Sequence, residues 1–140
     1  MSDAPCAICA RQTSEPPLWA DDLFELRHLE APYGLAGWML LSTRRHVASL
    51  GELDDAEAAA LGPLVRRCHR AVQAATGAAR VYVAALGEAV PHVHVHLVPR
   101  RADDARGFSL FDAQRAALAG ERAVDAAELA RVCAAIRAAL

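Results

Sequence analysis

The feature that most constrains this chain is a row of three histidines, His92, His94 and His96, that alternate with Val93 and Val95. Side chains of a β-strand point alternately to its two faces, so this spacing predicts three imidazoles on one face of a strand. Histidine titrates near neutral pH, so such a row can offer a nucleophile or base beside a proton donor, or can divide between a metal and a substrate. A pure metal site and a polar strand face are the alternatives.

Short apolar segments predict further strands around this row. They cover residues 22–29, 38–42 and 80–86, and the histidines belong to a strand over 92–98. The link between the last two strands has about five residues, which favours an antiparallel hairpin. We expect residues 1–18 to be irregular.

Two segments carry the signals of helices. Asp54 and Glu57 form a capping-box pattern before an apolar helical face, which predicts a helix that reaches Thr76 and ends at Gly77. The same pattern precedes an alanine-rich run and predicts a C-terminal helix over 126–140.

Composition limits the class of protein. The 140 residues are 54% hydrophobic and 23% charged, which predicts a single globular domain over 1–140 with a helical tail over 109–140. The net charge of -2 lacks the basic surplus that binding to long nucleic acid requires. The absence of lysine excludes a catalytic lysine and leaves arginine for contacts with anions. We expect a cytoplasmic protein, because neither a signal peptide nor a membrane-spanning segment is visible.

Cys6 and Cys9 form a Cys-x-x-Cys motif near the N-terminus. In the reducing location expected for this chain, such a pair favours metal binding or redox chemistry over a structural disulfide. The redox alternative is weakened because we expect that the pair does not open a helix after a strand, as thioredoxin-like motifs do.

Together these motifs resemble the histidine triad (HIT) superfamily, whose signature is three histidines alternating with apolar residues and ending in Pro-Arg. The features that follow the family's order over residues 5–101 are the Cys-x-x-Cys pair, Gly37 before a short strand, Arg44-Arg45-His46 after it, the histidine row, and Pro99-Arg100. The resemblance implies an α+β fold, in which an antiparallel sheet of about five strands carries packed helices, and a homodimer.

The resemblance also implies roles for two histidines. His94 would attack the α-phosphate of a nucleotide and form a covalent nucleotidyl-histidine, which water or another acceptor resolves. His96 would face the phosphate, stabilising its charge or assisting proton transfer. The implied substrates are dinucleoside polyphosphates, nucleotide phosphoramidates or adenylylated compounds. A non-catalytic zinc-containing nucleotide-binding module and a nucleotidyltransferase acting on a sugar phosphate are the alternatives.

In the zinc-containing branch of the superfamily, the first histidine of the row is a metal ligand. The resemblance therefore implies a closed, structural Zn²⁺ site made by Cys6, Cys9, His46 and His92. A solvated surface histidine is the alternative for His46.

Three candidate substrate-binding residues stand where the sequence meets or departs from the family pattern. Trp38 follows the turn glycine, where many members have a phosphate-facing histidine; its ring could stack on a base or pack in the core. Glu88 stands where a glutamine often contacts the phosphates, and its carboxylate would repel them unless it is protonated, paired or turned away. The ribose-binding acid of the family would correspond to Glu30, for which a solvated surface residue is the alternative.

Overall fold

The computed structural model describes residues 5–104 and 112–140, and within these ranges it has one antiparallel sheet of five strands in the order β1-β2-β3-β5-β4. The strands are β1 (Trp19–Ala20), β2 (Phe24–His28), β3 (Met39–Thr43), β4 (Arg80–Ala84) and β5 (His94–Arg100). The helices are α1 (Ala7–Ser14), α2 (Asp55–Thr76), α3 (Asp112–Leu118) and α4 (Ala126–Ala138), with a 3-10 turn at Leu50–Glu52. This confirms the predicted α+β fold.

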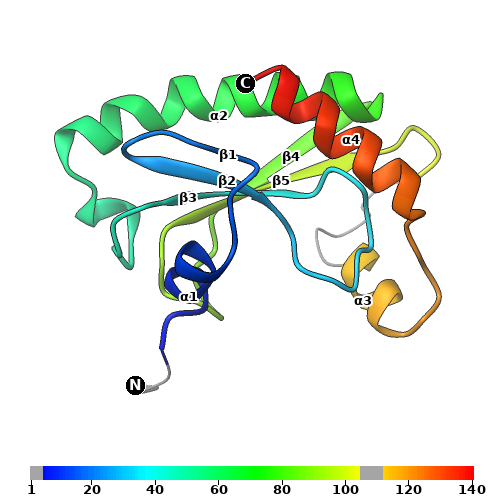
Figure 1. Cartoon of the computed structure of the whole chain (residues 1–140), viewed down its shortest axis with the longest axis horizontal. Helices are drawn as coiled ribbons and strands as arrows, with labels where there is room; N and C mark the ends of the chain where they lie inside the picture. Colours follow the sequence, from blue (N-terminus) through cyan, green and yellow to red (C-terminus); the bar gives the residue numbers. More distant parts are fainter. Residues whose placement is uncertain (1–4, 105–111) are drawn as a thin grey trace.

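The main core lies between the sheet and two helices. Figure 1 shows α2 and α4 along one face of the sheet, with α1 beyond the opposite face. The core under α2 contains Met39 and Leu41 of β3 and Val95 and Leu97 of β5. Because strand side chains alternate, His94 and His96 project from the other face of β5. The main core therefore fixes the direction in which the two histidines point.

The ends of α2 follow the sequence prediction. The Asp54 side chain accepts a hydrogen bond from the backbone N–H of Glu57 at 2.8 Å, and Glu57 accepts one from the backbone of Asp54 at 3.0 Å. Gly77 ends the helix with a φ of 66°. The helix continues through Pro63 without ending there. Both halves of the predicted capping box are therefore present.

Two expectations about the chain ends and the histidine strand were wrong. Residues 7–14 are helical rather than irregular; this helix has no buried residue and no side-chain N-cap, so its sequence carries little signal. The histidine strand β5 begins at His94 and continues to Arg100, rather than covering 92–98. The partner strand β3 begins at Met39, opposite Leu97, so Pro99 lies where one side of β5 is an edge, a position that accepts proline.

The described part of the C-terminal tail contains α3 and α4, and residues 119–125 between them are not helical. Asp125 accepts a hydrogen bond from the backbone of Glu128 at 3.1 Å and caps α4, as predicted. Residues 109–111 of the expected tail lie outside the described ranges, and the single domain over 1–140 stays a prediction. No helix in the described part of the chain is long and apolar enough to cross a membrane.

A tight turn brings the chain into β3. Gly37 has a φ of 89°, and a Cβ at this position would lie 2.6 Å from Cγ2 of Thr76. Its backbone N–H donates to Nε2 of His28 at 3.0 Å, while Nδ1 of His28 lies 2.9 Å from the carbonyl of Leu29. His28 therefore closes the turn that precedes Trp38.

Candidate active site and metal cluster

His94 and His96 lie side by side at one wall of a cavity of about 670 Å³. Their ring centroids are 5.0 Å apart. The rest of the lining comes from α1, the end of β2, β3 and the loop between β4 and β5, namely Ala7, Ile8, Arg11, Leu29, Glu30, Leu40 and residues 85–90. The described lining is mostly apolar.

The orientation of His94 is fixed by the backbone. Nδ1 of His94 lies 2.6 Å from the carbonyl oxygen of His92. A carbonyl only accepts, so Nδ1 carries a proton, and in the neutral imidazole the lone pair is therefore on Nε2. The side chain is half-buried and lines the cavity. His94 therefore has the tautomer that a nucleophile needs.

The indole of Trp38 forms a hydrogen bond with the imidazole of His96. Nε1 of Trp38 donates to Nδ1 of His96 at 3.1 Å, and the exposed fractions of the two residues are 1% and 9%. Burial, with a smaller contribution from the charge of His94, lowers the pKa of His96 to about 4. His96 is therefore neutral at pH 7, with its proton on Nε2.

The three candidate substrate-binding residues occupy different environments. Trp38 packs with Leu35, Val98 and Ala113 in a second apolar cluster and reaches the cavity through His96. Glu30 and Glu88 are exposed and line the cavity. A direct substrate contact stays a prediction for all three.

The four predicted metal ligands come together. Within Cys6, Cys9, His46 and His92, one ligand atom from each residue lies within 4.8 Å of all the others. Nδ1 of His92 is 3.4 Å from Sγ of Cys6 and 3.5 Å from Sγ of Cys9, and Nδ1 of His46 is 3.3 Å from Sγ of Cys9.

These distances fit tetrahedral zinc. Sulfur at about 2.3 Å and nitrogen at about 2.0–2.1 Å from one zinc ion would be about 3.5 Å apart in a tetrahedron. Two thiolates and two imidazoles are also the donor set that zinc prefers in structural sites. The four residues therefore form a cluster that can hold zinc.

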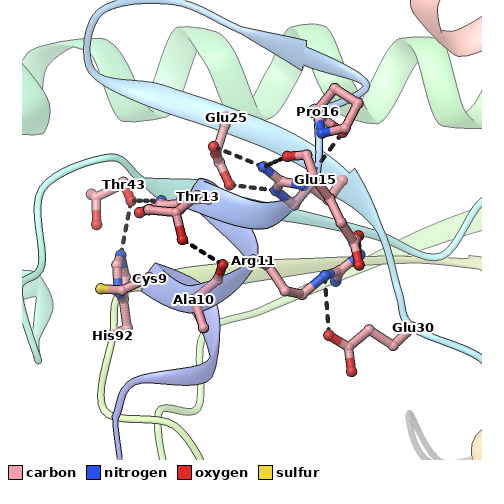
Figure 2. A network of polar contacts seen from close by, with 12 residues as sticks. Cys9, Ala10, Arg11, Thr13, Glu15, Pro16, Glu25, Glu30, Thr43 and His92 are labelled. Carbon is pink, nitrogen blue, oxygen red and sulfur yellow. Dashed lines mark hydrogen bonds and ion pairs between the residues drawn. The ribbon is translucent and has the colours of Figure 1, made fainter.

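The backbone selects the ligand atom of His92. This residue is fully buried, and its Nε2 lies 2.8 Å from the carbonyl oxygen of Thr43 (Figure 2). Nε2 must donate to that carbonyl, so the lone pair of Nδ1 faces the two sulfurs. Burial lowers the pKa of His92, which favours the neutral form that binds a metal. Gln12 of α1 donates to the same carbonyl at 2.9 Å.

Cys6 and Cys9 lie at the start of a helix and close to two histidines. Cys6 is the N-cap of α1, so the cysteine pair does open a helix, but Pro5, the described residue before it, is not in a strand. Both residues are free thiols. The two histidine nitrogens within 3.5 Å of Cys9 Sγ now favour the metal, because they complete a ligand set.

The sequence alone did not predict that α1 forms part of the cavity. Arg11 follows Cys9 by two residues, and its Nε lies 3.0 Å from Oε1 of Glu30, as Figure 2 shows. Arg27 of β2 holds the far end of the helix by donating to the carbonyl of Glu15 at 2.7 Å. The i,i+4 pair of Arg11 and Glu15 was the available signal of a helix.

The HIT domain family model matches residues 19–103. This chain belongs to the HIT family. The match includes His46 and the histidine row, whereas Cys6 and Cys9 lie outside it. Membership places the protein in a superfamily of nucleotide-binding proteins and nucleotide hydrolases.

Solved structures of HIT proteins have the same fold. A histidine triad protein from Bradyrhizobium japonicum is 25% identical, with a TM-score of 0.73 over 95% of this chain and 96% of that one. A Zn-bound histidine triad family protein from Mycobacterium smegmatis is 23% identical, with a TM-score of 0.67 over 96% and 91%. A hypothetical histidine triad nucleotide-binding protein from Sulfolobus tokodaii is 19% identical, with a TM-score of 0.71 over 96% and 91%. No curated protein matches the sequence.

Proposed function

We propose that this HIT protein is an enzyme that hydrolyses or transfers the nucleotidyl group of a small nucleoside phosphate derivative, with His94 as the nucleophile. The observation that carries the proposal is the 2.6 Å contact between Nδ1 of His94 and the carbonyl of His92. In the neutral imidazole this contact leaves the lone pair on Nε2, and the side chain lines the cavity. His96, the second histidine in the cavity, then offers an N–H to the phosphate.

The reaction has two displacements at phosphorus. The lone pair of His94 Nε2 attacks the α-phosphorus, and the leaving group departs with the electrons of its bond to phosphorus. The imidazole becomes cationic, and the carbonyl of His92 stabilises it through the proton on Nδ1. Water or another acceptor then attacks phosphorus, the N–P bond breaks, its electrons return to Nε2, and the acceptor's proton passes to solvent.

We infer that Cys6, Cys9, His46 and His92 hold a structural Zn²⁺ ion. The distances among their ligand atoms support this, as does the zinc in the M. smegmatis relative. A zinc ion with four protein ligands has no open position for substrate, so it stabilises the fold. These ligands would connect α1 to the segment after β3 and to the start of the histidine strand.

Three further expectations remain proposals. The substrate is a small nucleotide, since the cavity volume of about 670 Å³ is that of a small-molecule site. The protein forms a homodimer and is cytoplasmic, as the family resemblance and the sequence imply.

One feature favours a non-catalytic nucleotide-binding module as the second candidate. The loop between β4 and β5 lines the cavity with apolar side chains and Glu88, where the family places an amide and a hydroxyl. A carboxylate at that position opposes phosphate binding. A site that no longer turns over substrate would tolerate this change.

Turnover with a panel of nucleotide derivatives separates the two candidates. An enzyme releases a mononucleotide in a reaction that His94→Ala abolishes, and mass spectrometry detects a nucleotidyl group on His94 after rapid quenching. His69→Ala is the matched control, since His69 lies on α2 away from the cavity lining, and it should keep full activity. Nucleotide binding by both wild type and His94→Ala, without His94-dependent turnover, would favour the binding module.

A further inference from the structure

The contact between Trp38 and His96 restricts what His96 can do. An indole N–H only donates, so the 3.1 Å contact requires a lone pair on Nδ1 of His96. Protonating that nitrogen would set an N–H against the indole N–H in a buried environment. Burial of the imidazole also disfavours its protonation, because it lowers the pKa of His96.

We propose that Trp38 is a positioning residue that fixes His96 as a neutral Nε2–H donor, and that the site therefore takes nucleotidyl substrates whose leaving group departs as a weakly basic anion. This inference rests on the function proposed above. Trp38 touches no reacting atom in this proposal and acts through His96.

The proton count decides the class of leaving group. His94 enters the first displacement with its only proton on Nδ1, bonded to the carbonyl of His92. A neutral His96 can donate a hydrogen bond to the departing atom, but it is a poor acid. A carboxylate or phosphate leaves as a stable anion without taking a proton. An alkoxide or an amine needs one, and neither histidine readily supplies it.

The charges around the cavity further restrict which leaving groups the site accepts. Its described lining contains Glu30 and Glu88 but a single arginine, Arg11, whose Nε already faces Glu30 at 3.0 Å. A polyphosphate leaving group would place several negative charges in this environment. The loop that lines the cavity contains Leu86 and Val90, which favour an apolar group. The class that fits both constraints is a mixed anhydride of a nucleoside monophosphate with an apolar carboxylic acid.

The tautomer can be tested without turnover. In zinc-loaded protein labelled with ¹⁵N-histidine, His96 of the wild type should give the NMR shifts of a neutral imidazole with the proton on Nε2 from pH 6 to 8. In Trp38→Phe, which keeps a ring but removes the donor, these shifts should move toward a tautomeric mixture. Val98→Ala is the matched control, because it loosens the same apolar cluster and keeps the indole N–H. A wild-type Nδ1–H or imidazolium signal would overturn the proposal.

The substrate class is tested with three probes, each made with adenosine and with guanosine: a benzoyl nucleotidate, an alkylamine phosphoramidate and a dinucleoside tetraphosphate. The wild type should give its highest kcat/KM with the benzoyl probe. In Trp38→Phe the ratio of benzoyl to phosphoramidate turnover should fall by about tenfold, since an oriented donor contributes roughly 10²–10³ to rate. The ratio should be unchanged in Val98→Ala.

Failure of this inference differs from failure of the proposed function. If the phosphoramidate or the tetraphosphate is the best substrate of the wild type, or if Trp38→Phe leaves the ratio unchanged, the leaving-group proposal is wrong and the nucleophile proposal survives. If no probe gives His94-dependent turnover, the proposed function is wrong. The NMR result then still decides the role of Trp38.

Discussion

The backbone carbonyl of His92 lies 2.6 Å from Nδ1 of His94, while the imidazole of His92 belongs to the metal cluster. One residue therefore contributes its side chain to the cluster and its carbonyl to the candidate nucleophile. Its position is further fixed by the 2.8 Å contact between its Nε2 and the carbonyl of Thr43. A change in the cluster should therefore affect the orientation of His94.

Loss of the metal should weaken the cavity before it unfolds the sheet. Cys9→Ser should lower bound zinc well below one ion per chain, because a hydroxyl is a poor zinc ligand. Hydrogen exchange over residues 7–14 should become faster, since α1 buries no residue of its own. Metal analysis and exchange measured by mass spectrometry check both effects.

Cys133→Ser is the control for the metal prediction. Cys133 lies on α4, outside the cluster, and it is a free thiol like Cys9. This variant should keep full zinc content and wild-type exchange in α1. Full zinc content in Cys9→Ser would contradict the assignment of the ligands.

The turn before β3 should tolerate no side chain. Gly37→Ala places a Cβ 2.6 Å from Cγ2 of Thr76 at a residue with a φ of 89°. Left-handed strain and the steric conflict together should lower the free energy of unfolding by about 2–4 kcal/mol. Gly62→Ala is the control: its Cβ would meet no atom within 4 Å, and it lies inside α2. It should change the free energy of unfolding by less than about 1 kcal/mol, because the gain in helix propensity is opposed by the crowding of a Cβ directly before Pro63. Urea unfolding of both variants decides the comparison.

Arg11 should orient Glu30 rather than support the fold. Replacing Arg11 by methionine keeps much of the apolar stem and removes the charge that faces Glu30 at 3.0 Å. If Glu30 contacts the ribose, KM should rise several-fold while kcat changes little, because the reacting atoms are untouched. Steady-state kinetics with whichever of the three probes the wild type turns over best measures this. Arg66→Met, on the exposed face of α2, should leave KM unchanged.

His96 should make stability depend on pH. Its pKa is lowered to about 4 in the folded protein, mainly by burial, against about 6.5 in an unfolded chain. The unfolded chain therefore gains this proton as the pH falls below 6.5, and the folded chain gains it only near 4. The stabilising contribution is complete above pH 6.5 and is lost between about 6.5 and 4. Trp38 and His94 are among the groups that face His96.

A comparison with His96→Gln isolates this contribution. Both proteins are unfolded by denaturant at a series of pH values with excess zinc, so that metal loss affects both in the same way. The stability of the wild type relative to the variant should fall as the pH decreases from 6.5 to 4. A difference that stays constant over this range would show that His96 titrates normally.

Much of the fold followed from the sequence because the signals were local. The capping box of Asp54 and Glu57 predicted the start of α2, and the alternation in the histidine row predicted the face from which His94 and His96 project. The capping box and the histidine row depend on a few neighbouring residues whose geometry is regular. The four metal ligands are far apart in the sequence, and the resemblance to the family brought them into one hypothesis.

The features that could not be predicted depend on tertiary contacts. Helix α1 has a weak apolar face and is placed by distant groups, among them Thr43 and Arg27. The contact of Trp38 with His96 joins residues 58 positions apart in the sequence. The pairing of Arg11 with Glu30 likewise joins the cysteine segment to the end of β2. A pattern of neighbouring residues in the sequence does not predict such long-range contacts.

Glu88 should limit turnover of highly charged nucleotides. It lines the cavity from the loop between β4 and β5, and its charge repels an entering polyphosphate. Glu88→Gln removes that charge and retains a similar shape, so kcat/KM for a dinucleoside tetraphosphate should rise several-fold. The gain should shrink as salt is increased, because the side chain is exposed and its field is screened. A benzoyl nucleotidate carries less charge and should gain less. Equal gains for both probes would mean that Glu88 acts by shape or packing, and no gain for either would place its carboxylate away from the bound phosphates.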